Sequence, residues 1–309
     1  MPRKLLLTGG SGMVGRNIRE HPEAAQWEIL APSSRELDLT SAAAVENYIA
    51  AHKPDLVVHA AGKVGGIQAN MAEPVAFLDR NVMIGRNVIM GARAAGVKRL
   101  INLASTCIYP RHARNPLKEE QILTGALEPT NEGYALAKIV ALRLCQFVRR
   151  EDSSFHYKTL IPCNLYGFHD NFDLRSSHLI PAIIRKIDDA RRAGDKTVEI
   201  WGDGSARREF MFSGDLAGAV LRAAREPENL PDLMNLGVGH DHAINEYYET
   251  VARVIGWKGS FTHDLSKPVG MARKLCDTTR QTEWGWQPET SLEEGVARTY
   301  QHYLESAIP

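Results

Sequence analysis

The sequence predicts a doubly wound α/β fold of the Rossmann type, with a smaller, mixed C-terminal substrate lobe. Two observations lead to this prediction. Short and almost continuous apolar runs alternate with helical patterns through the first half of the chain, and a glycine-rich turn joins the first run to the first helix. Alternating strands and helices form a parallel sheet with helices on both faces, and strands buried on both faces are apolar throughout.

The strands of the predicted sheet are the five apolar runs of the first half. They are KLLLT (4–8), WEILA (27–31), DLVVHAA (55–61), RLINLAS (99–105) and YKTLIPC (157–163). Helical patterns occupy the intervals, near residues 13–20, 41–52, 74–96 and 132–151. The helix at 41 has a capping candidate in Thr40 or Ser41, directly before an alanine-rich amphipathic run.

The second half of the chain is less regular and predicts the smaller lobe. After a loop rich in Asn, Asp and Ser (169–178), helices are expected near 179–193, 215–226, 244–256 and 292–306, and strands at 197–202 and 233–239. We therefore expect a dinucleotide-binding domain over residues 1–164 and a substrate lobe over 165–309. Segments near 211–240 are expected to return to the first domain.

The composition is that of an ordinary globular protein and disfavours several classes of partner. The 309 residues are 44% hydrophobic and 24% charged, with Lys+Arg and Asp+Glu both 37. A net charge of zero offers no field that would attract nucleic acid or an anionic membrane. No segment approaches the roughly 20 apolar residues of a membrane span, and the apolar start is too short for a signal peptide. We expect a cytoplasmic protein with neither nucleic acid nor membrane as partner.

The cysteines are widely spaced and form no C-x-x-C pair; they are Cys107, Cys145, Cys163 and Cys276. This spacing favours neither a disulfide framework nor a zinc site. Cys145 and Cys163 are expected to be core thiols, whereas Cys107, at the end of a strand beside two hydroxyls, is either a packed hydrophobe or a catalytic group. His240 and His242 lie in a glycine loop without a third ligand nearby, so no metal site is expected.

The glycine-rich turn LLLTGGSGMVGRNI predicts a dinucleotide site. Gly9, Gly12 and Gly15 follow the first strand and open the first helix. Glycines at these positions permit a tight turn and let the backbone approach a pyrophosphate, which lies on the helix N-terminus. A glycine triplet alone is a weak signal, but its place in the first βα turn of an α/β chain makes it a strong one.

The end of the second predicted strand favours NADP(H) as the cofactor. In APSSRELDL, the residues Ser33, Ser34 and Arg35 come before Glu36 and Asp38. Hydroxyls and a guanidinium suit the 2′-phosphate of NADP, whereas an acidic residue would favour the 2′-hydroxyl of NAD. The alternative is that Arg35 is a solvated loop charge.

A second motif indicates redox chemistry on a carbonyl or hydroxyl. Tyr134 and Lys138 in NEGYALAKIV are four residues apart and lie on one helix face. We expect the ammonium to lower the phenol pKa so that Tyr134 can exchange a proton with substrate near neutral pH. Ser105, at the end of the fourth strand, can share the same substrate oxygen.

At these residues the chain resembles the extended short-chain dehydrogenase/reductases, and within them the GDP-L-fucose synthase family. The stretches that carry the resemblance span the chain: AGKVGGIQAN (61–70), STCIYP (105–110), LEPTNEGYALAK (127–138), NLYGFHDNF (164–172), SHLIPAIIRK (177–186), WGDGSARREF (201–210) and RKLCDTTR (273–280). Members of this family epimerise C3 and C5 of GDP-4-keto-6-deoxy-D-mannose and then reduce C4 with NADPH.

The resemblance implies a role for each site residue. It assigns Ser105, Tyr134 and Lys138 to reduction, and Cys107 and His178 to epimerisation as base and acid. We expect the Cys107 pKa to fall below its ordinary value of about 8.5 so that the thiolate can form. The expected cofactor contacts are Gly9, Ser11, Gly12, Met13, Val14, Gly15, Ser34, Arg35, Tyr134 and Lys138. The expected GDP-sugar contacts are Asn164, Lys186, Trp201, Arg208 and Lys274.

Related activities differ from this pattern at a few positions. Nucleotide-sugar 4,6-dehydratases have an Asp–Glu pair where this chain has Cys107 and Ile108, and a simple 4-epimerase needs no cysteine and histidine together. A non-catalytic NADP(H)-binding scaffold would be expected to lose Tyr134 or Lys138. His178 taken alone would be a capping or surface residue, because SSH precedes a helix.

The chain also departs from the family pattern. Ser11 and Ser34 stand where the family often has arginine, which leaves the use of NADH open. Val269 stands where an aspartate is frequent, so a GDP-L-colitose synthase, which inverts only C5, is the alternative. The family resemblance also implies a homodimer packed through the helices at 74–96 and 132–151.

Overall fold

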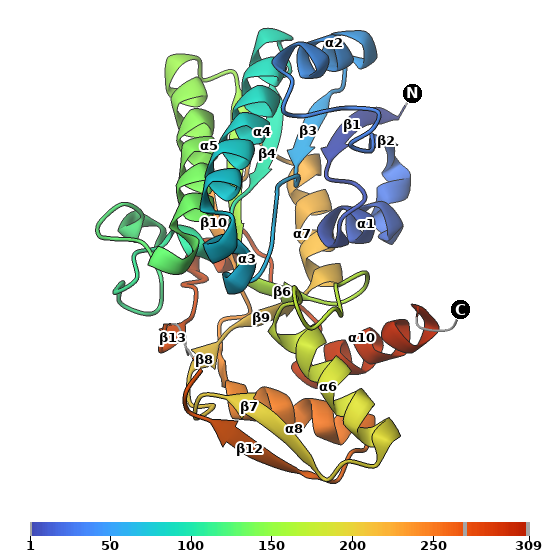
Figure 1. The fold of residues 1–309 in the computed structure, drawn as a ribbon. Helices are drawn as coiled ribbons and strands as arrows, with labels where there is room; N and C mark the ends of the chain where they lie inside the picture. Colours follow the sequence, from blue (N-terminus) through green and yellow to red (C-terminus); the bar gives the residue numbers. More distant parts are fainter. Residues whose placement is uncertain (1, 268–270, 307–309) are drawn as a thin grey trace.

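The computed structural model describes residues 2–267 and 271–306. The larger of its two lobes is built around a six-stranded parallel sheet (Figure 1). The strand order is β10-β5-β4-β3-β1-β2, and every neighbouring pair is parallel. The strands are β1 (Arg3–Thr8), β2 (Trp27–Leu30), β3 (Leu56–His59), β4 (Arg99–Leu103), β5 (His156–Pro162) and β10 (Leu233–Leu236). The predicted doubly wound α/β class is confirmed.

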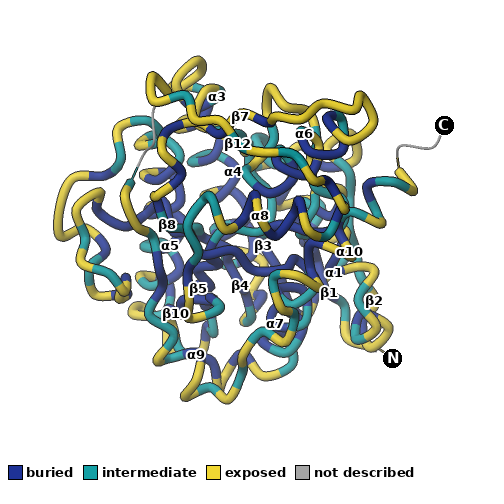
Figure 2. Tube along the Cα trace, turned by 90° about the horizontal axis from the view of Figure 1, so that it is seen from below, coloured by how far each residue is buried: buried dark blue, intermediate teal, exposed yellow. Residues whose placement is uncertain are grey.

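The strands are apolar throughout because helices cover both faces of the sheet. In β1, Leu5 and Leu7 pack with α1 (Met13–Glu20) and α7 (Ser213–Arg225). Leu6 points to the opposite face and packs with α2 (Ala42–His52), α4 (Pro74–Ala94) and α5 (Glu132–Glu151). Successive side chains of a strand alternate between faces, so a continuous apolar run fills both cores. Figure 2 shows the buried stretches concentrated where these strands lie.

The order of the strands reverses the direction of winding near the middle of the sheet. The chain runs from β1 outward to β2 and then returns past β1 to β3, so the direction of winding reverses between β1 and β3. In open α/β sheets, ligands bind outside the carboxyl ends of the strands at such a switch point. The glycine turn follows β1, and Ser105 follows β4, so both lie at this carboxyl end of the sheet.

A further hydrophobic core, separate from the two that flank the main sheet, is built from the later part of the chain and lies below the sheet in Figure 1. It contains α6 (Leu179–Ala193), α8 (Ile244–Ile255), α10 (Leu292–Ser306) and the parallel pair β7 (Thr197–Trp201) and β12 (Ser260–Asp264). Two further small sheets lie between the cores. One joins β6 (Asn164–Tyr166) to β9 (Phe210–Phe212), and the other has the order β11-β8-β13, from His242–Ala243, Arg207–Arg208 and Arg273–Lys274.

The longer elements match the predicted ranges within a few residues, but several short ones were not predicted. The unpredicted helices are α3 (Ile67–Ala72) and α9 (Thr279–Glu283), with 3₁₀ turns at Pro22–Gln26, Thr106–Ile108, Glu119–Gln121 and Pro129–Asn131. The unpredicted strands are β6, β8, β9, β11, β12 and β13. Most of these strands have only two or three residues. They form because segments distant in the sequence pair, so no local periodicity predicts them. Although β10 pairs within the main sheet and α7 packs against it, the domain boundary at residue 164 stays a prediction.

Among the described residues, no helix has the length and apolar character to cross a membrane.

Candidate active site

The glycine turn after β1 has the backbone geometry of a pyrophosphate cradle. Gly9 has a φ of 77°, which L side chains rarely adopt. A Cβ on Gly15 would lie 2.2 Å from the Gly9 carbonyl oxygen, so the helix can approach the turn only with glycine there. Gly12 is the N-cap of α1, and neither a side-chain cap nor an acidic residue occupies its first turn. The positive end of the helix is therefore left without a side-chain partner at the carboxyl end of β1 and suits an anion.

The turn after β2 presents Ser34 and Arg35 to solvent. The Ser33 amide donates a hydrogen bond of 2.7 Å to a Glu36 carboxylate oxygen, which holds this turn. The side chains of Ser34 and Arg35 are exposed beside it. Because the carboxyl end of β2 lies next to that of β1, these groups flank the cradle where the adenosine ribose of a dinucleotide would lie.

Ser105, Cys107, Tyr134 and Lys138 come together at the carboxyl end of β4. Ser105 begins the 3₁₀ turn Thr106–Ile108, and Cys107 is buried and shares a side-chain hydrogen bond with Ser105. Lys138 is buried on α5, where its Nζ donates to the Leu103 carbonyl at 2.8 Å and lies 5.6 Å from the Tyr134 ring centroid. Electrostatic coupling links Cys107 with both Tyr134 and Lys138.

The expected pKa directions at Tyr134 and Cys107 are wrong. Burial raises the pKa of Tyr134, and Lys138 directs a proton at a backbone carbonyl on β4. Burial also raises the pKa of Cys107, against the opposing influence of Lys274 and of the Ser105 hydrogen bond. Loss of hydration disfavours the charged form of each group, and this cost exceeds the help of neighbouring charges. The same cause lowers the pKa of Lys138 to about 8.

His178 lies at the N-cap of α6, in the second lobe. It makes no side-chain cap bond, so the capping interpretation does not hold. The residue is exposed, yet the surrounding groups desolvate the ring and lower its pKa. Within the described part of the chain, His178 makes no hydrogen bond with Ser105, Cys107, Tyr134 or Lys138.

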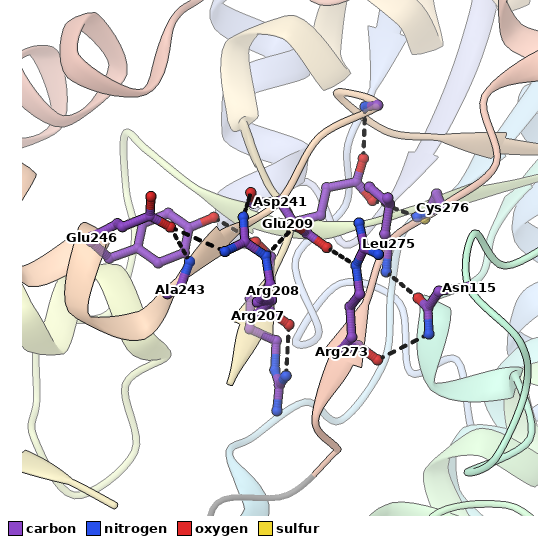
Figure 3. Close-up of polar contacts among 12 residues, drawn as sticks. Asn115, Arg207, Arg208, Glu209, Asp241, Ala243, Glu246, Arg273, Leu275 and Cys276 are labelled. Atoms are coloured by element: carbon purple, nitrogen blue, oxygen red, sulfur yellow. Dashed lines mark hydrogen bonds and ion pairs between the residues drawn. The ribbon is translucent and has the colours of Figure 1, made fainter. Parts of the chain in front are cut away.

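Arg208 and Lys274 form a pair on the small sheet β11-β8-β13. They are directly opposite each other across β8 and β13, as are Arg207 and Arg273. Figure 3 shows Arg207 and Arg273 converging on Asp241, while the Arg208 side chain points away from that pair. Lys274 is coupled electrostatically to Cys107, so its ammonium lies near that thiol. Two neighbouring cations suit a diphosphate.

Asn164 lies beside Arg208, whereas Lys186 and Trp201 lie together on the second lobe. Asn164, the first residue of β6, donates from Nδ2 to the Glu209 carbonyl at 2.9 Å and so adjoins Arg208. Trp201 ends β7, and 46% of its surface is exposed. The Nζ atoms of Lys186 and Lys267 each lie 5.5 Å from its ring centroid. An exposed indole ring with ammonium groups nearby is a surface on which a base can stack.

The sequence analysis missed two buried polar residues close to the site. His59 ends β3, and its Nδ1 lies 2.8 Å from the Thr8 hydroxyl at the end of β1. Burial, with the nearby Lys138, lowers the His59 pKa to about 3, so the ring is neutral. Glu209 follows Arg208 and is 1% exposed. In the sequence, each could have been noticed as a polar residue within or next to an apolar strand.

The remaining predicted positions lie apart from this chemistry. Cys145 and Cys163 are buried within the two cores of the main sheet. The His240 and His242 rings lie 5.3 Å apart, and no group of three or more His, Cys, Asp or Glu among the described residues could hold a metal ion. Val269 lies outside the described residues.

Comparison with known proteins agrees with this geometry over almost the whole chain. The chain is 55% identical to a GDP-L-fucose synthase of Azorhizobium caulinodans, over 98% of its own length and 96% of that protein. It is 49% identical to a GDP-L-colitose synthase of Yersinia pseudotuberculosis, over 97% and 98%. A crystal structure of a GDP-L-fucose synthetase from Naegleria fowleri bound to NADP superimposes with a TM-score of 0.88 at 26% identity, covering 98% and 93%. Residues 5–237 match the model of the NAD dependent epimerase/dehydratase family, and the chain belongs to that family.

Proposed function

We propose that the protein epimerises C3 and C5 of GDP-4-keto-6-deoxy-D-mannose and reduces C4 with NADPH, giving GDP-L-fucose. The observation that carries this proposal is the thiol of Cys107 among Ser105, Tyr134 and Lys138 at one strand end. A reductase that only moved hydride would need no buried thiol beside its proton donor. The 55% identity to a GDP-L-fucose synthase over nearly the full chain supports the same reaction.

The residues of the first βα turn fit NADP(H). A Cβ at Gly9 or Gly15 would meet the chain's own backbone at 2.8 Å or 2.2 Å, so glycine is required for the turn to pack this tightly. The backbone of Ser11, Gly12, Met13 and Val14 would hold the pyrophosphate at the start of α1, and Ser34 and Arg35 the 2′-phosphate. When bound, the cofactor supplies the hydride that reduces C4.

In the reduction, Tyr134 donates the proton and Lys138 holds the reacting groups in place. A carbonyl that gains a hydride must also gain a proton, and the raised pKa of Tyr134 keeps its hydroxyl protonated for that step. The Ser105 hydroxyl donates a second hydrogen bond to the same oxygen. Lys138 is fixed by the Leu103 carbonyl and has two further N–H donors for the ribose of the cofactor.

In the epimerisation, Cys107 and His178 act on opposite faces of the sugar. The 4-ketone acidifies the hydrogens at C3 and C5, because the electron pair of each broken C–H bond moves into the carbonyl and gives an enolate. The Cys107 thiolate takes that proton, Tyr134 and Ser105 donate hydrogen bonds to the enolate oxygen, and His178 returns a proton to the other face of the carbon. The Lys274 ammonium favours the thiolate.

The GDP moiety would be held by groups of the second lobe. Arg208 and Lys274 neutralise the diphosphate, Trp201 with Lys186 faces the guanine, and Asn164 adjoins the ribose. We also propose that the lobe over residues 165–309 closes on the cofactor domain when both ligands are bound, and that the protein works in the cytoplasm.

A GDP-L-colitose synthase is the second candidate, favoured by one observation. The chain is 49% identical to such an enzyme over 97% of its length. That reaction begins from a 4-keto-3,6-dideoxy sugar and needs inversion at C5 alone, so the same five catalytic residues suffice.

Incubation with each ketosugar and NADPH in deuterated water, followed by NMR of the product, tests the proposal. GDP-L-fucose labelled at C3 and C5 is the expected product from GDP-4-keto-6-deoxy-D-mannose. Faster turnover of the dideoxy substrate with label at C5 alone would favour the colitose reaction. Binding of NADPH without turnover of either substrate would indicate a non-catalytic scaffold.

We also propose a homodimer that packs through α4 and α5. Large apolar side chains are exposed along these helices and the α3 segment before them: Val64, Ile67, Met71, Val75, Leu78, Leu136, Val140 and Phe147. Val75 is 77% exposed and Met71 63%. A contiguous set of exposed apolar side chains on two adjacent helices is typical of a subunit interface.

A further inference from the structure

Glu209 is a buried carboxylate with an unusual set of partners. Its Oε1 accepts hydrogen bonds from the amides of Val238 at 2.7 Å and Gly239 at 2.9 Å. Its Oε2 accepts from the amide of Cys276 at 2.8 Å, and the Cys276 thiol also bonds to it. The side chain is 1% exposed. All four partners are donors, so they suit a group that only accepts, which is the ionised carboxylate.

Two of the three segments tied by this carboxylate carry the cations proposed to bind the diphosphate. Arg208 directly precedes Glu209, and Lys274 is two residues before Cys276. The loop of Val238 and Gly239 leads to Asp241, which binds Arg207 and Arg273 on the other face of the small sheet. Figure 3 shows the Glu209 side chain extending toward Cys276 while Arg208 points elsewhere.

This arrangement holds two like charges side by side. Arg208 and Lys274 are directly opposite on neighbouring strands, where like charges repel. The pair β8–β13 has only two residues in each strand, so its own ladder is a weak restraint. Backbone bonds from two other segments to one buried carboxylate supply the missing restraint. The Glu209 carbonyl also accepts from Asn164, which brings a third predicted GDP contact under the same control.

Gly237 shows that the local backbone leaves room for this side chain. A Cβ on Gly237 would lie 2.5 Å from Glu209 Oε1 and 3.1 Å from its Cδ. The amide and carbonyl of Gly237 are held by the Gln281 side chain at 2.8 Å and 3.0 Å. The glycine loop is thus fixed on one side by an amide and on the other by the carboxylate.

We propose that Glu209 is a positioning residue that sets the spacing of Arg208 and Lys274 and thereby the affinity for the diphosphate of a GDP-sugar. This inference rests on the proposed function. Glu209 touches no reacting atom, so its contribution falls on substrate binding, with the cofactor site on the other lobe unaffected.

The test is calorimetric binding of GDP-mannose and, separately, of NADPH to the wild type and to Glu209→Gln. Glutamine keeps the shape but turns an N–H₂ group toward amide donors. The variant is expected to bind GDP-mannose at least about tenfold more weakly, equivalent to about 1.4 kcal/mol, with the NADPH Kd within about twofold. In turnover, KM for the ketosugar rises while kcat stays within about threefold.

Glu119→Gln is the matched control. Glu119 is also buried; its Oε1 accepts from the Asn235 amide at 2.8 Å and its carboxylate pairs with Arg280, but within the described part of the chain it bonds directly to none of Val238, Gly239 and Cys276. It is expected to leave both affinities unchanged. Wild-type affinity for GDP-mannose in Glu209→Gln, or an equal loss for GDP-mannose and NADPH, would overturn the positioning role.

Two further outcomes have distinct meanings. If Glu209→Gln does not fold, Gly237→Ala decides, because its Cβ displaces the same carboxylate from the other side. It is expected to weaken GDP-mannose alone, and unchanged affinity would overturn the inference. If the wild type itself binds no GDP-mannose, the proposed function fails rather than the role of Glu209.

Discussion

Replacing Gly15 by alanine tests whether the first βα turn is shaped for the cofactor. A Cβ at this position would lie 2.2 Å from the Gly9 carbonyl oxygen and 2.6 Å from the Gly10 Cα. Both neighbours are backbone atoms, which no rotamer change can move. Because a Cβ essentially never comes within 3.0 Å of another heavy atom, helix α1 must shift from the turn by at least 3.0 − 2.2 = 0.8 Å.

The shift has a cost in stability and a larger one in binding. Overpacking of this kind costs roughly 1–3 kcal/mol, and each kcal/mol lowers the Tm of a chain this large by about 2–4 °C. A displacement near 1 Å in a positioned site can cost about 10²-fold. We therefore expect the NADPH Kd of Gly15→Ala to rise by about two orders of magnitude.

Fluorescence titration with NADPH and a thermal melt measure the two effects, with Gly12→Ala as the control. Gly12 has a φ of −79°, and a Cβ there would lie 3.5 Å from the Gly9 carbonyl oxygen, an ordinary contact. Gly12→Ala should keep the wild-type Tm, so any loss of NADPH affinity reports the approach of the ligand itself. A Gly15→Ala protein with wild-type Tm and NADPH affinity would refute the reasoning.

Four other results are expected. Cys107→Ser should abolish solvent deuterium at C3 and C5 in the NMR assay, and labelling that survives would contradict its role as base. Tyr134→Phe should slow NADPH oxidation by about 10²–10⁴-fold, and a near-normal rate would remove it from the reduction. Because burial lowers the Lys138 pKa to about 8 and the charged form is the one required, the rate of reduction should fall as pH rises through that value; a rate that stays level to pH 10 would contradict this. Val140→Asp, at an exposed position of α5, should give a monomer by light scattering, and an intact dimer would exclude that face.

The parts of the fold that were predictable are those in which local sequence decides the structure. A strand such as β1 is buried on both faces, so its composition alone identifies it. Gly9 and Gly15 lie in the loop and the first helical turn directly after this strand. Tyr134 and Lys138 are neighbours because they are four residues apart on one helix. In each case the information lies within a few consecutive residues, and the structure reproduces it.

The arrangement of the substrate side depends on contacts between distant segments. Arg208 and Lys274 become neighbours only because two-residue strands pair, and no periodicity marks strands so short. Glu209 follows two arginines, so it resembles a member of a surface charge cluster until the fold encloses it. Single basic residues could be proposed from the family resemblance, whereas their register and the carboxylate behind them required the structure.

The directions of the pKa shifts also could not be predicted from the sequence. The sequence reveals which charges are near one another, but desolvation depends on the whole fold, and it dominates at both Cys107 and His178. With the thiol pKa raised and the imidazole pKa lowered, the pair holds one proton at neutral pH, and that proton is on sulfur. The thiolate and imidazolium that the proposed epimerisation requires contain together the same number of protons. Changing pH near neutrality therefore cannot create them. In the proposed mechanism the proton must therefore move from the sulfur to the imidazole, and the nearby Lys274 ammonium favours the thiolate that remains.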